Sequence, residues 1–232
     1  WQVSENIVDG LYMVKLSAID RAGNITSIST TIEIDRTSPE VYFTQPVVST
    51  QVVNYYLGSG NISLYGTIID KYVKEYKIKL VTEQGFEDLI KSASISNPVY
   101  NTYFTQINTA GLEENYTLIL EGIDRAGNIG VSSINLEIDN TPPYIYITLP
   151  QEYEYYRGNI EIWGTVKDKN FDYYILEYKT NTGDYVKIPV EYSNIAIENG
   201  ILGSYVSAGE TLCNLKVTAY DKAGNSSSYI IN

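Results

Sequence analysis

An Asp followed by a basic residue, Ala, Gly and Asn occurs three times, at residues 20–24, 124–128 and 221–225. We call this five-residue motif the pentad. Its Asp can accept hydrogen bonds from nearby backbone amides, its Gly can adopt a positive φ, and its Asn tolerates the left-handed region. These properties favour a tight hairpin turn. Carboxylate oxygens are also ligands for hard cations, so the motif poses a choice between a turn and a site.

The composition of the chain argues against catalytic chemistry. The 232 residues include no His and one Cys, so the chain lacks the usual general base at neutral pH and a Cys–His pair. Glu113 and Glu114 are adjacent acids, but we place them on a strand, where neighbouring side chains point to opposite faces. We therefore expect a protein that is not an enzyme.

The charge balance limits the possible partners. The net charge is −12, and Lys and Arg form no cluster, so we expect no nucleic-acid partner. No apolar run approaches about 18 residues, so we expect no membrane insertion in this segment. Residues 1–30 lack a charged start followed by an apolar core, the pattern of a targeting peptide. The chain is expected to be soluble.

The pentad belongs to a longer repeat with a period of about 100 residues, the size of an immunoglobulin-like (Ig-like) domain. The sequence IEIDRTSPEVYFTQP at 32–46 aligns with LEIDNTPPYIYITLP at 136–150. We predict a complete repeat over 37–140 and a second over 141–232 with its last strand cut short. Residues 1–36 match only the C-terminal strands of a truncated repeat.

Alternation with a period of two indicates β-strands throughout. Segments 61–69, 73–81, 115–123 and 130–138 are predicted strands, separated by Gly, Asn and Pro. Every second residue before each pentad Asp is apolar or small, which predicts one face on a core. These residues are Ala18, Leu16, Val14 and Tyr12; Gly122, Leu120, Leu118 and Tyr116; and Ala219, Val217, Leu215 and Cys213. The predicted fold class is all-β, with tandem immunoglobulin-like β-sandwiches, and Tyr12 and Tyr116 are candidates for a tyrosine corner.

The pattern Y-x-L-x-L-x-G-x-D-R-A-G-N, followed by IEIDRTSPEV or LEIDNTPPYI, resembles the tandem bacterial Ig-like repeats of large cell-surface and adhesin proteins. This resemblance implies a noncatalytic structural or adhesive segment of a larger extracellular surface protein, which acts as a semi-rigid stalk. Such modules also occur as spacers, so the alternative is a carbohydrate-binding or spacer module of a secreted polysaccharide-active enzyme or a surface-layer protein. Implied partners are neighbouring repeats of the same longer chain and a host or cell-surface protein or carbohydrate.

The resemblance also implies a metal site, because some of these arrays bind Ca²⁺ at interdomain junctions. In a sandwich, the Asp of the linker, the Asp after the second strand and the pentad Asp should meet at one pole. Three carboxylates would repel one another unless a cation or basic side chains were near. Arg125, Lys222 and Arg36 adjoin these positions, so neutralisation without metal is the alternative. The candidate trios are Asp35, Asp70 and Asp124, and Asp139, Asp168 and Asp221.

Overall fold

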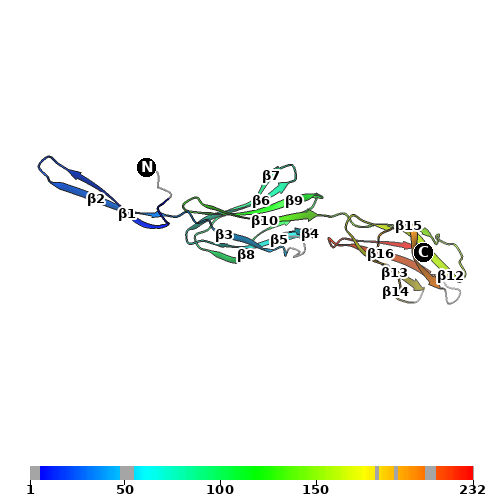
Figure 1. The fold of residues 1–232 in the computed structure, drawn as a ribbon. Coiled ribbons are helices and arrows are strands. Elements are labelled where there is room, and N and C mark those ends of the chain that lie inside the picture. Colours follow the sequence, from blue (N-terminus) through cyan, green and yellow to red (C-terminus); the bar gives the residue numbers. More distant parts are fainter. Residues whose placement is uncertain (1–5, 48–54, 181–182, 191–192, 207–212, 232) are drawn as a thin grey trace. The chain divides into compact units, whose positions relative to one another are not determined.

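The computed structural model describes residues 6–47, 55–180, 183–190, 193–206 and 213–231 (Figure 1). Within these ranges every element of regular secondary structure is a strand. No helix there is long and apolar enough to cross a membrane. The predicted all-β class is confirmed.

The chain begins with a two-stranded antiparallel sheet of β1 (Gly10–Ile19) and β2 (Ile25–Ile34). Two further sheets follow. One has the order β3-β5-β8 and the other β4-β10-β9-β6-β7, in which β4 pairs parallel with β10. Their strands are β3 (Glu40–Gln45), β4 (Tyr55–Gly58), β5 (Asn61–Ile69), β6 (Val73–Thr82), β7 (Glu87–Ser94), β8 (Val99–Asn108), β9 (Asn115–Asp124) and β10 (Ile129–Ile138).

The C-terminal part repeats this plan with two smaller sheets, in the orders β11-β12-β15 and β14-β13-β16-β17. Their strands are β11 (Tyr144–Leu149), β12 (Asn159–Lys167), β13 (Phe171–Thr180), β14 (Val186–Ile188), β15 (Ile197–Val206), β16 (Cys213–Asp221) and β17 (Ser226–Ile231). The four strands predicted from alternation correspond to β5, β6, β9 and β10, with ends that differ by at most one residue.

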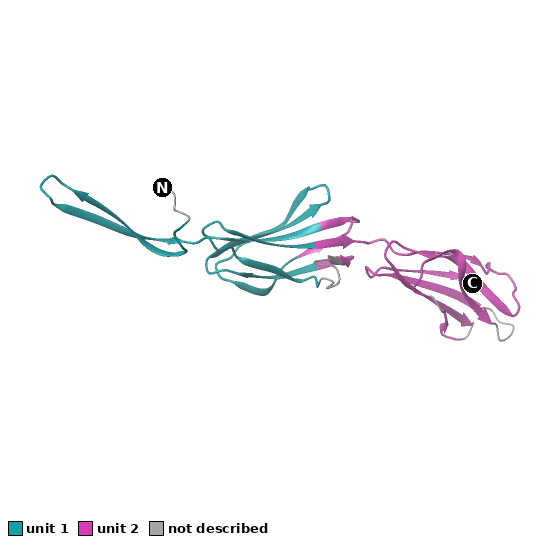
Figure 2. Ribbon diagram, viewed as in Figure 1, with its two compact units in different colours: residues 1–50, 63–105, 117–134 teal, residues 51–62, 106–116, 135–232 magenta. Residues whose placement is uncertain are grey.

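By compactness the chain divides into two units (Figure 2). Unit 1 comprises residues 1–50, 63–105 and 117–134, and unit 2 comprises residues 51–62, 106–116 and 135–232. These limits follow spatial proximity, whereas the limits at 36 and 140 follow the sequence repeat. The predicted domain boundaries stay a prediction.

The core of each unit is built from alternate strand residues. In unit 1, Leu64 and Ile68 of β5 and Leu118 and Leu120 of β9 are fully buried. The small residue two positions before the pentad Asp allows the opposing sheet to approach, because a Cβ on Gly122 would lie 2.6 Å from Val41 Cγ1. Unit 2 has an equivalent core that includes Ile147, Ile162, Val166, Tyr174, Leu176, Leu202, Leu215, Val217 and Ala219.

In the first hairpin, formed by β1 and β2, the alternate apolar residues are not buried in a core. Leu16 of β1 is 70% exposed and Ile28 of β2 is 72% exposed, although both lie on the face that carries the core in the other copies. The predicted core face is confirmed in β9 and β16, whereas the equivalent face of β1 and β2 is exposed, because no strand among the described residues covers it. The hydroxyl of Tyr12 donates to the carbonyl of Val8 at 2.8 Å, the bond of a tyrosine corner.

Candidate metal centre

The pentad forms the turn of a hairpin in all three copies, between β1 and β2, β9 and β10, and β16 and β17. The backbone N–H of its Asp donates to the carbonyl of its Asn at 3.0, 3.2 and 3.1 Å. The pentad glycines have φ values of 92°, 95° and 94°, which L side chains rarely adopt. The predicted hairpin turn is confirmed.

The pentad carboxylate holds the turn closed with both oxygens. Asp124 Oδ1 accepts from the backbone N–H groups of Gly127 and Asn128 at 2.7 and 2.8 Å, and Asn128 Nδ2 donates to Oδ2 at 2.7 Å. Asn225 repeats the two bonds of Asn128, with its backbone N–H donating to Asp221 Oδ1 at 2.7 Å and its Nδ2 donating to Oδ2 at 2.8 Å. Because each Asp ends a buried strand, Asp124 is 0% exposed and Asp221 is 4% exposed.

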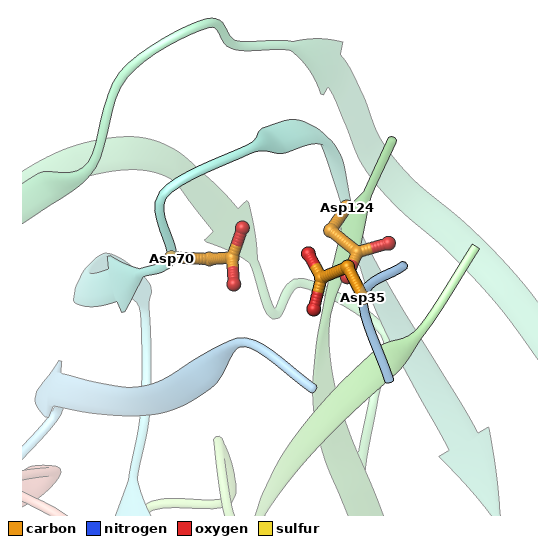
Figure 3. A group of neighbouring side chains, drawn as sticks. All are labelled: Asp35, Asp70 and Asp124. Carbon is orange, nitrogen blue, oxygen red and sulfur yellow. The ribbon is translucent and has the colours of Figure 1, made fainter. Parts of the chain in front are cut away.

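Two further Asp residues join Asp124 in unit 1 (Figure 3). Asp70 follows β5 and accepts from the backbone N–H of Tyr72 through Oδ1 at 2.6 Å. Asp35 follows β2 and accepts from the backbone N–H of Thr37 through Oδ1 at 3.1 Å. One carboxylate oxygen from each of the three residues lies within 4.8 Å of the others. We call this group the first trio.

Unit 2 contains the second trio, Asp139, Asp168 and Asp221, which meets the same 4.8 Å limit. Asp168 accepts from the backbone N–H of Asn170 at 2.6 Å, and Asp139 accepts from that of Thr141 at 3.1 Å. Asn170 Nδ2 also donates to Asp139 Oδ2 at 2.7 Å. The first trio has Tyr72 at the position of Asn170, so the two groups differ in this amide.

The electrostatics of the second trio are unfavourable when no cation is bound. Burial raises the pKa of Asp168, the charges of Asp139 and Asp221 raise it further, and the hydrogen bond from Asn170 opposes these effects. The nearby Lys residues do not pair with the trios. Lys71 pairs with Glu33 at 3.2 Å and Lys169 with Glu137 at 2.7 Å, and no ion pair among the described residues involves a trio carboxylate.

The structure thus brings together every Asp of both candidate trios, and metal binding itself stays a prediction. One local expectation was wrong. Glu113 and Glu114 lie in the loop before β9 and not on a strand. Glu113 accepts from the backbone N–H of Asn140 at 3.1 Å, so it has a structural partner. Sequence reasoning missed this contact and the role of Asn170, since neither residue belongs to the repeated letters.

Comparison with known families supports the assignment of the repeat. Residues 3–36 match the family model described as a bacterial Ig-like domain. The resemblance to bacterial Ig-like repeats is confirmed by this match. The matched residues include the first pentad and both strands of the first hairpin. The match agrees with the expectation of a structural Ig-like segment.

Two solved structures to which the chain is similar contain several repeats or domains. A tetra-tandem repeat from the extending region of a large adhesion protein is 19% identical, with a TM-score of 0.36, and the match covers 98% of this chain and 58% of that one. The FN1–FN3 domains of chicken CNTN1 are 12% identical, with a TM-score of 0.33, and the match covers 95% of this chain and 77% of that one. No curated protein matched the sequence.

Proposed function

We propose that this chain is a noncatalytic stalk segment of a larger extracellular surface protein, in which Ca²⁺ bound by the two Asp trios stiffens the linkers after β2 and β10. The observation that carries the proposal is the recurrence of the trio. Three carboxylates from three separate segments converge at equivalent positions in both units. Like charges are costly to gather, so a cation is the simplest reason for doing so twice.

The donor set fits a hard cation. Carboxylate oxygens are preferred ligands of Ca²⁺, which takes six to eight oxygens in flexible geometry. In the first trio, the hydrogen bonds to Asp35 and Asp70 use Oδ1, which leaves Oδ2 of each residue as a ligand. Bound Ca²⁺ would supply positive charge that joins the linker, the loop after β5 and the pentad.

The linkers are suited to a stiff array. Pro39 and Pro143 restrict the backbone just after the trio Asp residues, and both are buried. A Cβ on Gly130 would lie 1.8 Å from the carbonyl oxygen of Pro39, so the linker packs tightly against the start of β10. The hydroxyl of Ser227 in β17 donates to the carbonyl of Pro143. Each linker therefore packs on the hairpin that carries its pentad.

The test is thermal unfolding of the whole chain in EDTA and then in millimolar Ca²⁺. At a concentration about 100 times the Kd, binding should stabilise the folded state by about 2.7 kcal/mol and raise Tm. Asp35→Asn and Asp139→Asn should each reduce the rise, because each removes a ligand charge from one trio. The matched control is Asp88→Asn, at an exposed acid on β7, and this variant should keep the full rise in Tm. Equal Tm values in EDTA and Ca²⁺ would contradict the proposal.

A further inference from the structure

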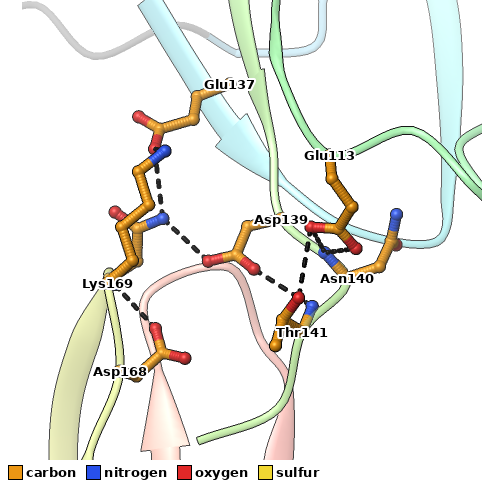
Figure 4. A network of polar contacts seen from close by, with 8 residues as sticks. Glu113, Glu137, Asp139, Asn140, Thr141, Asp168 and Lys169 are labelled. Carbon is orange, nitrogen blue, oxygen red and sulfur yellow. Dashed lines mark hydrogen bonds and ion pairs between the residues drawn. The ribbon is translucent and has the colours of Figure 1, made fainter.

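One peptide group in each linker is bound from both sides. In unit 2 it is the peptide that joins Asp139 to Asn140. Its carbonyl accepts from Asn225 Nδ2 at 2.8 Å, and Asn225 is the last residue of the pentad. Its N–H donates to Glu113 at 3.1 and 3.2 Å to the two carboxylate oxygens, and Glu113 lies before β9 (Figure 4). Side chains from two distant parts of the sequence therefore bind opposite ends of the same amide.

The same arrangement occurs in unit 1 at the peptide that joins Asp35 to Arg36. Asn128 Nδ2 donates to the carbonyl of Asp35 at 3.1 Å. The N–H of Arg36 donates to Asp9 Oδ2 at 3.0 Å. Asp9 stands before β1 as Glu113 stands before β9, so the acid occupies the same place in the repeat. This bond, together with the one from Thr37, lowers the pKa of Asp9.

The linker Thr adds a second bond to each acid. Thr37 Oγ1 donates to Asp9 Oδ2 at 2.9 Å, and Thr141 Oγ1 donates to Glu113 Oε2 at 3.3 Å (Figure 4). The acid changes from Asp to Glu between the copies, yet the bonded groups are the same. A charged acceptor makes such bonds stronger than neutral ones.

The residue between the linker Asp and the linker Thr is Arg36 in the first copy and Asn140 in the second. Its side chain also anchors the linker, with a different chemical group in each copy. Asn140 Nδ2 donates to the carbonyls of Thr109 and Leu112 at 2.8 Å each, and Asn140 Oδ1 accepts from the backbone N–H of Gly60 at 3.1 Å. In the first copy, the guanidinium of Arg36 donates to the carbonyl of Ile7. Both side chains thus bond to the segment that supplies the acid.

We propose that Asp9 and Glu113 are linker-positioning residues, which together with Asn128 and Asn225 clamp the linker peptide without any metal. The clamp sets the backbone that carries Asp35 and Asp139 before an ion arrives. It does not depend on Ca²⁺ binding, because every contact in it is a hydrogen bond within the protein. The pentad is therefore a turn and also one half of a linker clamp.

The test is amide hydrogen exchange, resolved by residue, on the whole chain in EDTA. The N–H of Asn140 should be protected, and Glu113→Gln should speed its exchange by about tenfold or more because a charged acceptor is lost. Glu114→Gln, a change at the adjacent residue, is the matched control and should leave that rate unchanged. The amide of Leu120 in the core of β9 is the internal reference, since it reports global unfolding.

A faster rate at Asn140 with an unchanged rate at Leu120 would support the clamp. The clamp proposal would be overturned if the amide of Asn140 were unprotected in EDTA. It would also be overturned if this amide exchanged at the same rate in the Glu113→Gln and Glu114→Gln variants. If Glu113→Gln lowers global stability, Thr141→Val provides a second measurement, because it removes only the hydroxyl bond to Glu113. Thr141→Val is then expected to speed amide exchange at Asn140 by less than Glu113→Gln does, and an unchanged exchange rate would overturn the proposal. Because metal is absent throughout, failure of the calcium proposal would leave this result unaffected.

Discussion

The first hairpin and the hairpin of β9 and β10 carry the same pentad in different surroundings. Asp20 accepts from the backbone N–H groups of Ala22 and Asn24 at 2.9 Å each, and Asn24 Nδ2 donates to Asp20 Oδ2 at 2.7 Å. These bonds lower the pKa of Asp20, chiefly through the side chain of Asn24 and then through its N–H. Asp124 makes the same two bonds with Asn128, accepts a third from the backbone N–H of Gly127, and in addition meets Asp35 and Asp70.

The comparison separates two levels of organisation. The turn forms wherever the five residues occur, because its bonds join groups at most four positions apart. The trio and the clamp form only where a linker and the loop after the second strand reach the turn. The pentad is thus a local structure that becomes part of a site through tertiary contacts.

The largest expected difference between the two hairpins concerns the core. Leu120→Ala should destabilise the chain by about 2–5 kcal/mol, because Leu120 is fully buried and its truncation leaves a cavity. Leu16→Ala, at the equivalent position of β1, should change stability by about 0.5 kcal/mol or less, since Leu16 is 70% exposed. Urea unfolding of both variants checks this. Similar losses would mean that the first hairpin is packed as the second one is.

A smaller difference is expected at the pentad Asn. Asn225→Ala should cost about 1–3 kcal/mol, because it removes the side-chain donor to the carbonyl of Asp139 and to Oδ2 of Asp221, whereas the backbone N–H at position 225 still donates to Oδ1. Asn24→Ala removes the bond to Asp20 but no linker bond, so its cost should be smaller. Denaturant midpoints in EDTA measure both effects. Equal costs would show that Asn225 acts only within its turn.

The smallest effect on stability is expected at Asp168, where the informative observation is the direction in which stability changes with pH. Its pKa in the folded state is raised, so between the unfolded and folded pKa values the native state binds more protons. Its contribution to stability therefore falls as pH rises through that range. Asp168→Asn keeps an acceptor for the N–H of Asn170, so in EDTA it should stabilise the chain at neutral pH and lose this advantage in acid. In Ca²⁺ the same variant should bind the ion more weakly. Melting curves across pH, with Asp172→Asn as an exposed control, distinguish these outcomes.

Much of the fold could be predicted because it depends on local pattern. Alternation placed β5, β6, β9 and β10 to within one residue, since a strand with one buried face needs apolar residues at every second position. Aligning the repeats also selected the six Asp residues of the trios. Their convergence depends on strand order, which the resemblance to Ig-like repeats supplied.

Other features were beyond sequence reasoning for a physical reason. The clamp uses backbone N–H and carbonyl groups, which every residue has, so no residue type marks the partner of Glu113. The alternation within β1 is like that of β9 and does not by itself report that Leu16 is exposed; the match of residues 1–36 to only part of a repeat indicated that partner strands were lacking. Burial depends on what covers a face.

The sequence by itself determined the strands, the three turns and the recurrence of the pentad, because these depend on interactions within a few residues. Only the tertiary structure decided which pentads join a trio, which linker peptide is bound from both sides and which apolar face is covered. Those outcomes depend on groups that are far apart in the chain. Their positions follow from the packing of whole sheets and not from the neighbouring residues.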